Sequence, residues 1–138
     1  MSLSNEYETK ALKFLFTPES TNAASGLRPS TLHLALFTSS PSDTSFGTEV
    51  AATNTNYVRQ AAAFTISGSN ATNTAAIEFA ECGTANYGAV AAVGIVDSST
   101  ATAATNIIAY AALTGGAKTI NTGDIFRIPA GDLDINLD

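Results

Sequence analysis

Residues 88–96 read Gly-Ala-Val-Ala-Ala-Val-Gly-Ile-Val, and residues 106–113 read Asn-Ile-Ile-Ala-Tyr-Ala-Ala-Leu. Between them lies a small, polar segment, Asp97 to Thr105, with the composition of a turn. Two short Val/Ile/Ala runs joined in this way predict a pair of antiparallel strands. An amphipathic helix could also bury such residues, but Gly94 and the β-branched content favour strands.

Both runs are apolar on both faces, which predicts that both strands lie in the middle of a covered sheet. In the first run, strict alternation would assign the large residues to opposite faces, with Val90 and Val96 on one and Val93 and Ile95 on the other. We therefore expect other elements to cover this pair of strands on both sides.

The composition argues against several classes of function. The chain has 138 residues, enough for one domain, and a formal net charge of -6 with only six Lys and Arg. These cations form no basic stripe, which argues against binding to nucleic acid or to an anionic membrane surface. No run is long enough to span a bilayer, and no signal peptide is expected. The single cysteine, Cys82, permits no intrachain disulfide and is interpreted as a small packed residue.

The N-terminal 16 residues carry the only helical pattern. Asn5 and Glu8 have the spacing of a capping box, and Thr17-Pro18 should end the helix. One apolar stripe is predicted, formed by Tyr7, Ala11, Phe14 and Leu15. This helix should dock on its own chain or on a neighbour, and docking on its own chain is favoured. We expect residues 1–30 to form the helix and a connecting arm, and residues 31–138 to form the main domain.

Several further short strands are predicted. In the strand from Thr31 to Thr38, Leu32, Leu34 and Leu36 share one face, and His33, Ala35 and Phe37 share the other. The remaining strands are expected over residues 57–66, 74–80, 118–120, 124–129 and 133–138, with loops at 39–56 and 81–87 and a turn at 67–70.

Within these strands the alternation also assigns directions. In residues 57–66 it points Val58, Ala62, Phe64 and Ile66 inward and Arg59 outward, and in residues 74–80 it points Ile77 and Phe79 inward and Glu78 outward. Seven to eight short strands with polar turns indicate a mainly β fold, an antiparallel, jelly-roll-like β-sandwich with one short N-terminal α-helix.

No catalytic constellation stands out. His33 is the only histidine, and among apolar neighbours it is interpreted as a packed or interface residue rather than a catalyst. Twelve acidic residues provide many candidate pairs for glycoside hydrolysis, but nothing selects one. The acids near the C-terminus, Asp124, Asp132, Asp134 and Asp138, lack the spacing of an EF-hand. We expect no enzymatic activity, no cofactor and no metal.

Several segments resemble a family of small proteins from tailed bacteriophages, usually described as phage tail-fibre proteins. The matching segments are Leu3-Ser4-Asn5, Ser30-Thr-Leu-His-Leu-Ala-Leu-Phe-Thr38, Tyr57-Val-Arg-Gln-Ala61, Ala71-Thr-Asn-Thr-Ala-Ala-Ile-Glu-Phe79, Gly94-Ile-Val-Asp97, Ala112-Leu113, Lys118-Thr-Ile-Asn-Thr-Gly-Asp124 and Ala130-Gly-Asp-Leu-Asp-Ile-Asn-Leu-Asp138. The resemblance covers nearly the whole chain. Its motifs are signatures of strands and turns, and they carry over no catalytic residue.

The resemblance implies a structural protein of the virion, assembled in the host cytoplasm. It would serve as a capsid decoration or cement subunit, such as a head fibre or knob, or as a component of a tail fibre or baseplate. Its expected partners are further copies of itself, with a trimer favoured, and other virion proteins such as the major capsid or tail proteins. The low charged fraction, 13%, agrees with extensive protein contacts. The candidate interface residues are Tyr7, Phe14, Leu15, His33, Phe37 and Tyr110.

The alternative is a tip module that binds a host receptor or surface glycan. Tyr57, Tyr87 and Tyr110 could stack on a sugar while loop Asn and Asp side chains bind its hydroxyl groups. Tyr110 lies within an apolar strand, so for this residue we expect packing in the core or in an interface.

Overall fold

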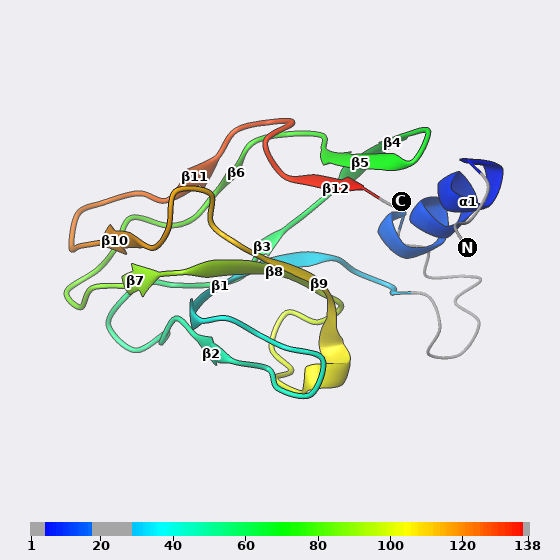
Figure 1. Ribbon diagram of the computed structural model, residues 1–138. Helices are drawn as coiled ribbons and strands as arrows, with labels where there is room; N and C mark the ends of the chain where they lie inside the picture. Colours follow the sequence, from blue (N-terminus) through cyan, green and yellow to red (C-terminus); the bar gives the residue numbers. More distant parts are fainter. Residues whose placement is uncertain (1–4, 18–28, 137–138) are drawn as a thin grey trace.

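The computed structural model describes residues 5–17 and 29–136, which form a helix at one end and a body of short strands (Figure 1). The elements are, in order, α1 (Asn5–Phe16), β1 (His33–Ser39), β2 (Thr48–Glu49), β3 (Gln60–Ala61), β4 (Phe64–Ser67), β5 (Asn70–Asn73), β6 (Ile77–Glu78), β7 (Gly88–Val90), β8 (Ala92–Val96), a 3-10 turn (Ala104–Asn106), β9 (Ile107–Ala112), β10 (Lys118–Ile120), β11 (Arg127–Ile128) and β12 (Asp134–Asn136). The chain is mainly β, with antiparallel sheets and one short N-terminal helix, as predicted, although its strands are shorter and more numerous than seven or eight.

The two central runs form the predicted antiparallel pair. β8 lies between β1 and β9 in a five-stranded sheet with the order β2-β1-β8-β9, in which β3 also pairs with β1. All five residues of β8 are buried, as the two-sided apolar pattern predicts. The same prediction is wrong for β9, which is the last strand of the sheet and is exposed over its second half.

The predicted alternation of residues 90–96 is wrong because the strand is interrupted at Ala91. The N–H of Ala91 donates to the carbonyl of Phe37 over 2.8 Å, and the carbonyl of Ala91 accepts from the N–H of Leu113 over 3.0 Å. The interruption resets the alternation, since a shift of one residue moves every following side chain to the other face. Val90 therefore lies in the main core with Val93 and Ile95, whereas Val96 packs on the opposite face.

β1 separates two apolar clusters, as its sequence predicts. Leu34 and Leu36 of β1, together with Leu32 just before it, belong to the main core, whereas Ala35 and Phe37 form a smaller cluster with Ala92 and Val96. The absence of a side chain at Gly94 makes room for Phe37, because a Cβ at Gly94 would lie 2.8 Å from Cε2 of that ring. The close approach of these two strands thus depends on glycine at this position.

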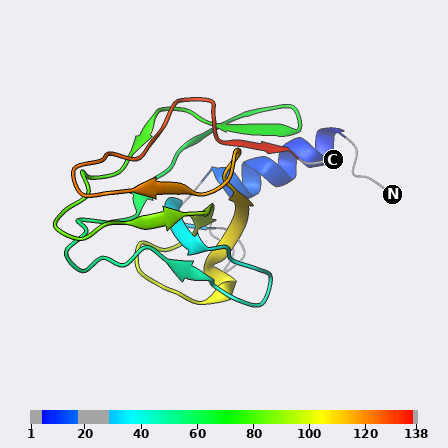
Figure 2. The same ribbon diagram turned by 60° about the vertical axis from the view of Figure 1, so that its left-hand side comes forward.

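Three smaller antiparallel sheets complete the body: β10 with β7, β11 with β6, and β12-β5-β4. Figures 1 and 2 show β4, β5, β6, β11 and β12 lying along one side of the five-stranded sheet, whereas β7 runs in line with β8 and contacts β1. The predicted strand over residues 57–66 is divided into β3 and β4, and the turn predicted at 67–70 is shorter because Asn70 already begins β5. The loop predicted at 39–56 contains β2 and a bridge between Ser42 and Ser45.

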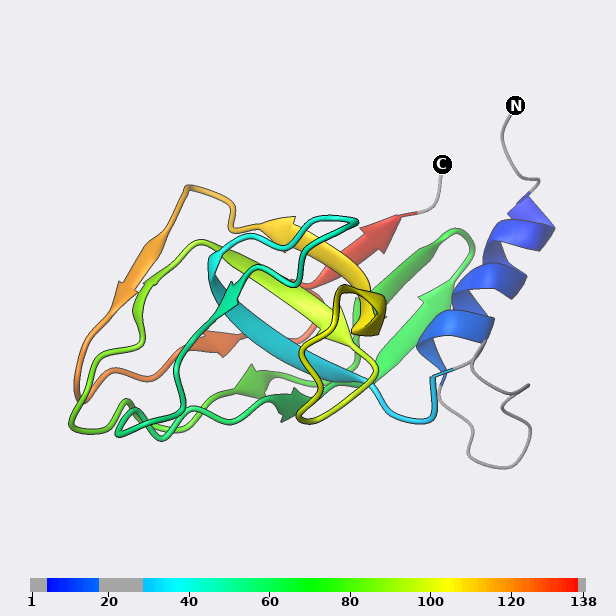
Figure 3. The ribbon, with the colours of Figure 1, turned by 90° about the horizontal axis from the view of Figure 1, so that it is seen from below.

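The helix α1 packs on its own chain, against β4 and β5, at the end of the molecule opposite β7 and β10 (Figure 3). Leu12 and Phe16 are buried in the main core, and the Phe16 ring meets the Phe64 ring edge-on at 5.2 Å. Each buried side chain of this size contributes roughly 1.5–3 kcal/mol, which explains why the helix docks. The predicted stripe is wrong in part, because Leu12 and Phe16 face inward while Phe14 is 39% exposed. The side chain of Tyr7 lies outside the described residues.

Candidate functional site

A buried ion pair joins the loops at one end of the five-stranded sheet. Nε and Nη2 of Arg59 each donate to one carboxylate oxygen of Glu49 over 2.7 Å. Nη1 donates to the carbonyls of Ser98 (2.8 Å) and Ala101 (3.0 Å), and the ring of Phe46 lies 5.3 Å from the guanidinium carbon. The prediction that Arg59 points outward is wrong, because these acceptors compensate the cost of burying its charge.

Tyr57 extends this cluster into the main core. Its hydroxyl accepts from the N–H of Leu36 over 2.9 Å and donates to Oε1 of Glu49 over 2.7 Å. Burial raises the pKa of Tyr57 far above its ordinary value. Val58, predicted to face inward, is 64% exposed, because Tyr57 and Arg59 take the inward positions on either side of it. The cluster therefore connects β1, β2 and the 98–101 loop by hydrogen bonds. The bonds described for the side chains of Tyr57, Arg59 and Glu49 are all made to other groups of the same chain.

His33, the single histidine, is half-buried at the start of β1. Its Nδ1 is buried and has no hydrogen-bond partner. Burial lowers the pKa of His33, and the positive charge of Arg59 lowers it further. An imidazole that acts as a general base is usually oriented by a hydrogen bond at its other ring nitrogen, and the described residues give Nδ1 no such partner.

Cys82 and Tyr87 are also structural. Cys82 is buried, and its Sγ lies 3.2 Å from the carbonyl oxygen of Ala85, in agreement with its interpretation as a small packed residue. The Tyr87 hydroxyl donates to the carbonyl of Ala80 over 2.7 Å, and burial raises its pKa. Tyr57 and Tyr87 are therefore closed to a sugar, contrary to the suggestion that they could stack on one.

Sequence reasoning missed Asn73, a buried amide at the end of β5. Its Nδ2 donates to the carbonyls of Ala75 (2.9 Å) and Pro129 (2.8 Å), and its Oδ1 accepts from the N–H of Leu133 (2.9 Å). This side chain fixes the C-terminal turn against β5, so that β12 can pair with it. The signal in the sequence is the small, polar run Asn-Ala-Thr-Asn at residues 70–73, where the sequence prediction has the end of a turn at Asn70 and the next strand only from Thr74.

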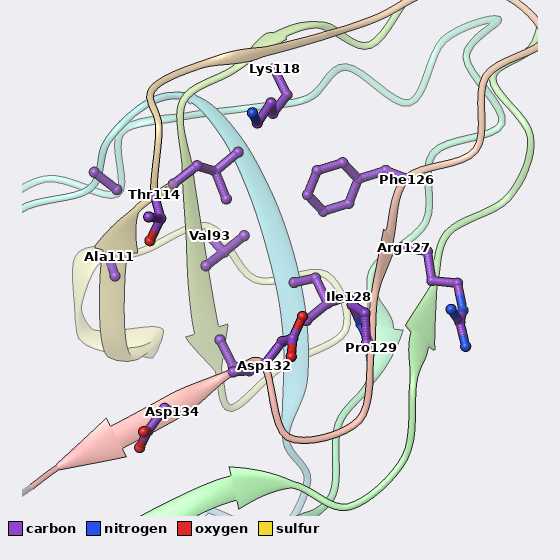
Figure 4. Close-up of a pocket in the computed structure, with 13 residues that line it drawn as sticks. Val93, Ala111, Thr114, Lys118, Phe126, Arg127, Ile128, Pro129, Asp132 and Asp134 are labelled. Carbon is purple, nitrogen blue, oxygen red and sulfur yellow. The ribbon is translucent and has the colours of Figure 1, made fainter.

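An open groove lies between the exposed strand β9 and the C-terminal segment (Figure 4). It encloses about 500 Å³, and Val93, Phe126 and Ile128 supply apolar lining. A smaller hollow of about 230 Å³ continues it along β9 toward β12 and shares Val93, Ala111, Leu133 and Asp134 with it. Lys118, Arg127, Asp132 and Asp134 bring both signs of charge to the groove.

The side chains of β9 itself carry no charge. Tyr110 is 42% exposed, Ala111 and Ala112 are exposed, and residues 98–117 contain no Asp, Glu, Lys or Arg. The Tyr110 hydroxyl donates to Oδ1 of Asp43 over 3.2 Å, and the charge of Asp43 raises the pKa of Tyr110. Tyr110 is thus not packed in the core of its own chain.

The residues that we predicted for an interface are not gathered on one surface. Phe14 and Tyr110 are exposed, Leu15 and His33 are half-buried, and Phe37 is fully buried, with its ring 5.3 Å from that of Phe46. Phe14 belongs to α1 and Tyr110 to β9, which lie in different parts of the structure (Figure 1).

Over residues 5–17 and 29–136, no three His, Cys, Asp or Glu side chains are grouped so that they could hold a metal ion. In the same part of the chain, no helix has the length and apolar character needed to cross a membrane.

Comparison with known proteins gives one family. A family model described as "Podophage GP4 fiber I protein gp80" matches residues 2–136. A search of curated proteins finds no match. The matched range includes every strand described above, together with the groove, the ion pair and the open strand β9.

Proposed function

Because the chain belongs to the podophage GP4 fiber I protein family, a family of phage fibre proteins, we propose that it is a non-enzymatic building block that assembles on the phage particle. The observation that carries this proposal is the extent of the family match, residues 2–136 of 138. The whole fold, and not a short motif, is thus shared with fibre proteins.

The chemistry of the described residues supports a structural role. The groups best suited to catalysis are used inside the molecule: Glu49 pairs with Arg59, and the neighbouring Tyr57 bridges Glu49 to β1. His33 lacks a hydrogen-bond partner at Nδ1. The cluster of Arg59, Glu49 and Tyr57 fixes the neighbouring loops in one conformation. A subunit that assembles in many copies needs such a rigid structure.

The proposed arrangement of this subunit is a β-sandwich, with the five-stranded sheet on one side and the smaller sheets on the other. In support, the main core takes residues from both groups, among them Leu34 and Ile95 from the first and Phe64 and Ala71 from the second. Such a short, compact body suits a knob or cement subunit, either a capsid decoration or head fibre or part of a tail fibre or baseplate, better than a long shaft.

The proposed partners are further copies of the chain and other virion proteins such as capsid or tail proteins. The uncharged surface of residues 98–117 supports this, because charged residues are depleted at the centres of protein interfaces. Among the candidate interface residues, Tyr110 and Phe14 are the most exposed of those whose side chains are described.

The deciding experiment is localisation in the intact particle. We expect mass spectrometry of purified virions to detect the chain, and an electron cryomicroscopy map to contain its fold at a symmetric site on the head or tail. Particles from phage lacking the gene should lose that density. Absence of the chain from purified virions would refute the proposal.

A second candidate, the glycan-binding tip, is favoured by the groove of Figure 4. A half-buried aromatic ring, Phe126, lines the same groove as the carboxylates of Asp132 and Asp134, a combination that suits the apolar face and the hydroxyl groups of a sugar. Glycan arrays of host surface polysaccharide should then show binding that is lost in Phe126→Ala. No binding by the folded wild-type protein would refute this candidate.

A further inference from the structure

The strand β9 presents an unpaired edge. It ends the order β2-β1-β8-β9, and within residues 5–17 and 29–136 no strand pairs with its outer side. The N–H of Leu113 donates inward to Ala91, and hydrogen bonding alternates along an antiparallel strand. The N–H and C=O groups of Ala112 and Tyr110 therefore point outward, toward the open edge.

This edge lacks the features that usually prevent strands from pairing with other molecules. Edge strands are commonly protected by charged side chains, proline or a covering segment. Ile107 to Ala112 contains no charge and no proline, and the side chains of Tyr110, Ala111 and Ala112 are exposed. An edge with free backbone groups and no protection is a template for another strand.

We propose that β9 pairs edge to edge, in antiparallel orientation, with β9 of a second copy of this chain, so that the two sheets become continuous. The biological role of this contact rests on the proposed function as a virion building block. A twofold axis perpendicular to the sheet would pass beside Ala111, which then faces Ala111 of the second copy. In this register Tyr110 lies opposite Ala112 of the second copy, and Ala109 lies opposite Leu113 of the second copy, so each large side chain meets a small one.

The distribution of charge favours a second copy as the occupant. Two chains with a net charge of -6 repel each other, and the repulsion is smallest where the contact surface itself carries no charge. Residues 98–117 contribute no charge on either chain, and the charged side chains that border β9 include both signs: Asp43, Lys118, Asp132 and Asp134. The outward backbone groups of Tyr110 and Ala112 also match those of an identical antiparallel strand without any change in conformation.

The first experiment places a charge on the edge. Ala112→Lys introduces a cation at β9, and Ala130→Lys, on the exposed C-terminal turn, changes the net charge equally and serves as the control. By sedimentation equilibrium we expect wild type and Ala130→Lys to have twice the mass of the 14.1 kDa chain, and Ala112→Lys to have the mass of one chain. Ala112→Pro, which removes only an outward N–H, should act in the same way as Ala112→Lys. Circular dichroism would verify that each variant is folded.

The second experiment tests the register. In a Cys82→Ser background, Ala111→Cys should form a disulfide-linked dimer on mild oxidation, because Cα atoms in such non-hydrogen-bonded pairs lie about 4.5 Å apart, within disulfide range. Ala89→Cys, at an exposed position on β7, should remain uncrosslinked.

A monomeric wild-type protein, or an oligomer of any size that persists unchanged in folded Ala112→Lys, would overturn the inference. An oligomer that forms only with another virion protein would also overturn it. These results are independent of localisation: a chain found in virions with an unused β9 edge refutes only this inference, and a dimer absent from virions refutes only the proposed function.

Discussion

Arg59 and Glu49 form a two-point ion pair between the segment before β3 and the strand β2, with both N–O contacts at 2.7 Å. The same guanidinium reaches two carbonyls of the loop at residues 98–101. One side chain thus binds a residue 10 positions before it and a loop that lies up to 42 positions after it. The predicted outward orientation of Arg59 would have left all three segments without this connection.

Arg59→Ala should lower the free energy of unfolding by about 3–5 kcal/mol, since removing one partner leaves a largely buried carboxylate and several acceptors uncompensated. Arg59→Lys should recover only part of this loss, because an ammonium cannot donate to both carboxylate oxygens in the same geometry. Urea denaturation followed by circular dichroism would measure both. As a control, Arg127→Ala breaks the exposed pair with Glu78, 3.6 Å apart, and should cost less than about 1 kcal/mol. Equal losses in the two alanine variants would contradict the structural role of the Arg59–Glu49 pair.

Alkaline pH should destabilise the protein through its buried tyrosines. Burial raises the pKa values of Tyr57 and Tyr87 in the folded chain, whereas tyrosine in an unfolded chain ionises near about 10. Their stabilising effect is complete below that pH and declines as the pH rises above it, because only the unfolded chain then releases the protons. The free energy of unfolding should therefore fall between about pH 9 and about pH 11, and the fall should be smaller in Tyr57→Phe. The control is Tyr110→Phe: the charge of Asp43 also raises the pKa of Tyr110, but this contact is exposed and screened by solvent, so the reduction should be smaller than in Tyr57→Phe. An equal reduction in the two variants would contradict the assignment to the buried tyrosines.

Gly94→Ala should destabilise the central sheet by about 1–3 kcal/mol, because the new Cβ would lie 2.8 Å from a ring carbon of the fully buried Phe37. Thermal unfolding would measure the loss. Phe37→Leu in the same chain should recover part of it by vacating that space, so the two substitutions should be less than additive. Strict additivity would indicate that Gly94 is required for a reason other than its contact with Phe37.

How far the sequence predicts this fold depends on whether side-chain alternation is continuous. In β1 the alternation is uninterrupted, and both faces were predicted correctly. At Ala91 and around Arg59 the alternation is interrupted, and the faces were predicted wrongly. The interruption at Ala91 involves a hydrogen bond to Phe37, and the inward position of Arg59 depends on its ion pair with Glu49. Periodicity contains no information on such long-range partners.

The open edge of β9 and the groove beside it could not be predicted either, because both depend on residues that are distant in the sequence. The apolar run at Ile107–Ala112 was visible in the sequence, but its place at the edge of the sheet was not, since strand order is a property of the whole fold. The groove was also not predicted, because it brings Val93 and β9 together with residues 118–134. Cys82 could be interpreted from composition alone because packing a small residue requires no specific partner.

Asn73→Asp should lower the free energy of unfolding by about 1–3 kcal/mol, although it is nearly isosteric. A carboxylate at this position still accepts from Leu133, but it cannot donate to the carbonyls of Ala75 and Pro129, which it would repel. The loss should be smaller in acid, where a protonated carboxyl can restore one of the two donated hydrogen bonds. Urea denaturation at neutral and acidic pH would test this against Asn121→Asp, an exposed substitution with the same change in charge, which should have little effect at either pH. If Asn73→Asp is as stable as wild type, Asn73 does not fix the C-terminal turn, and the pairing of β12 with β5 must depend on other contacts.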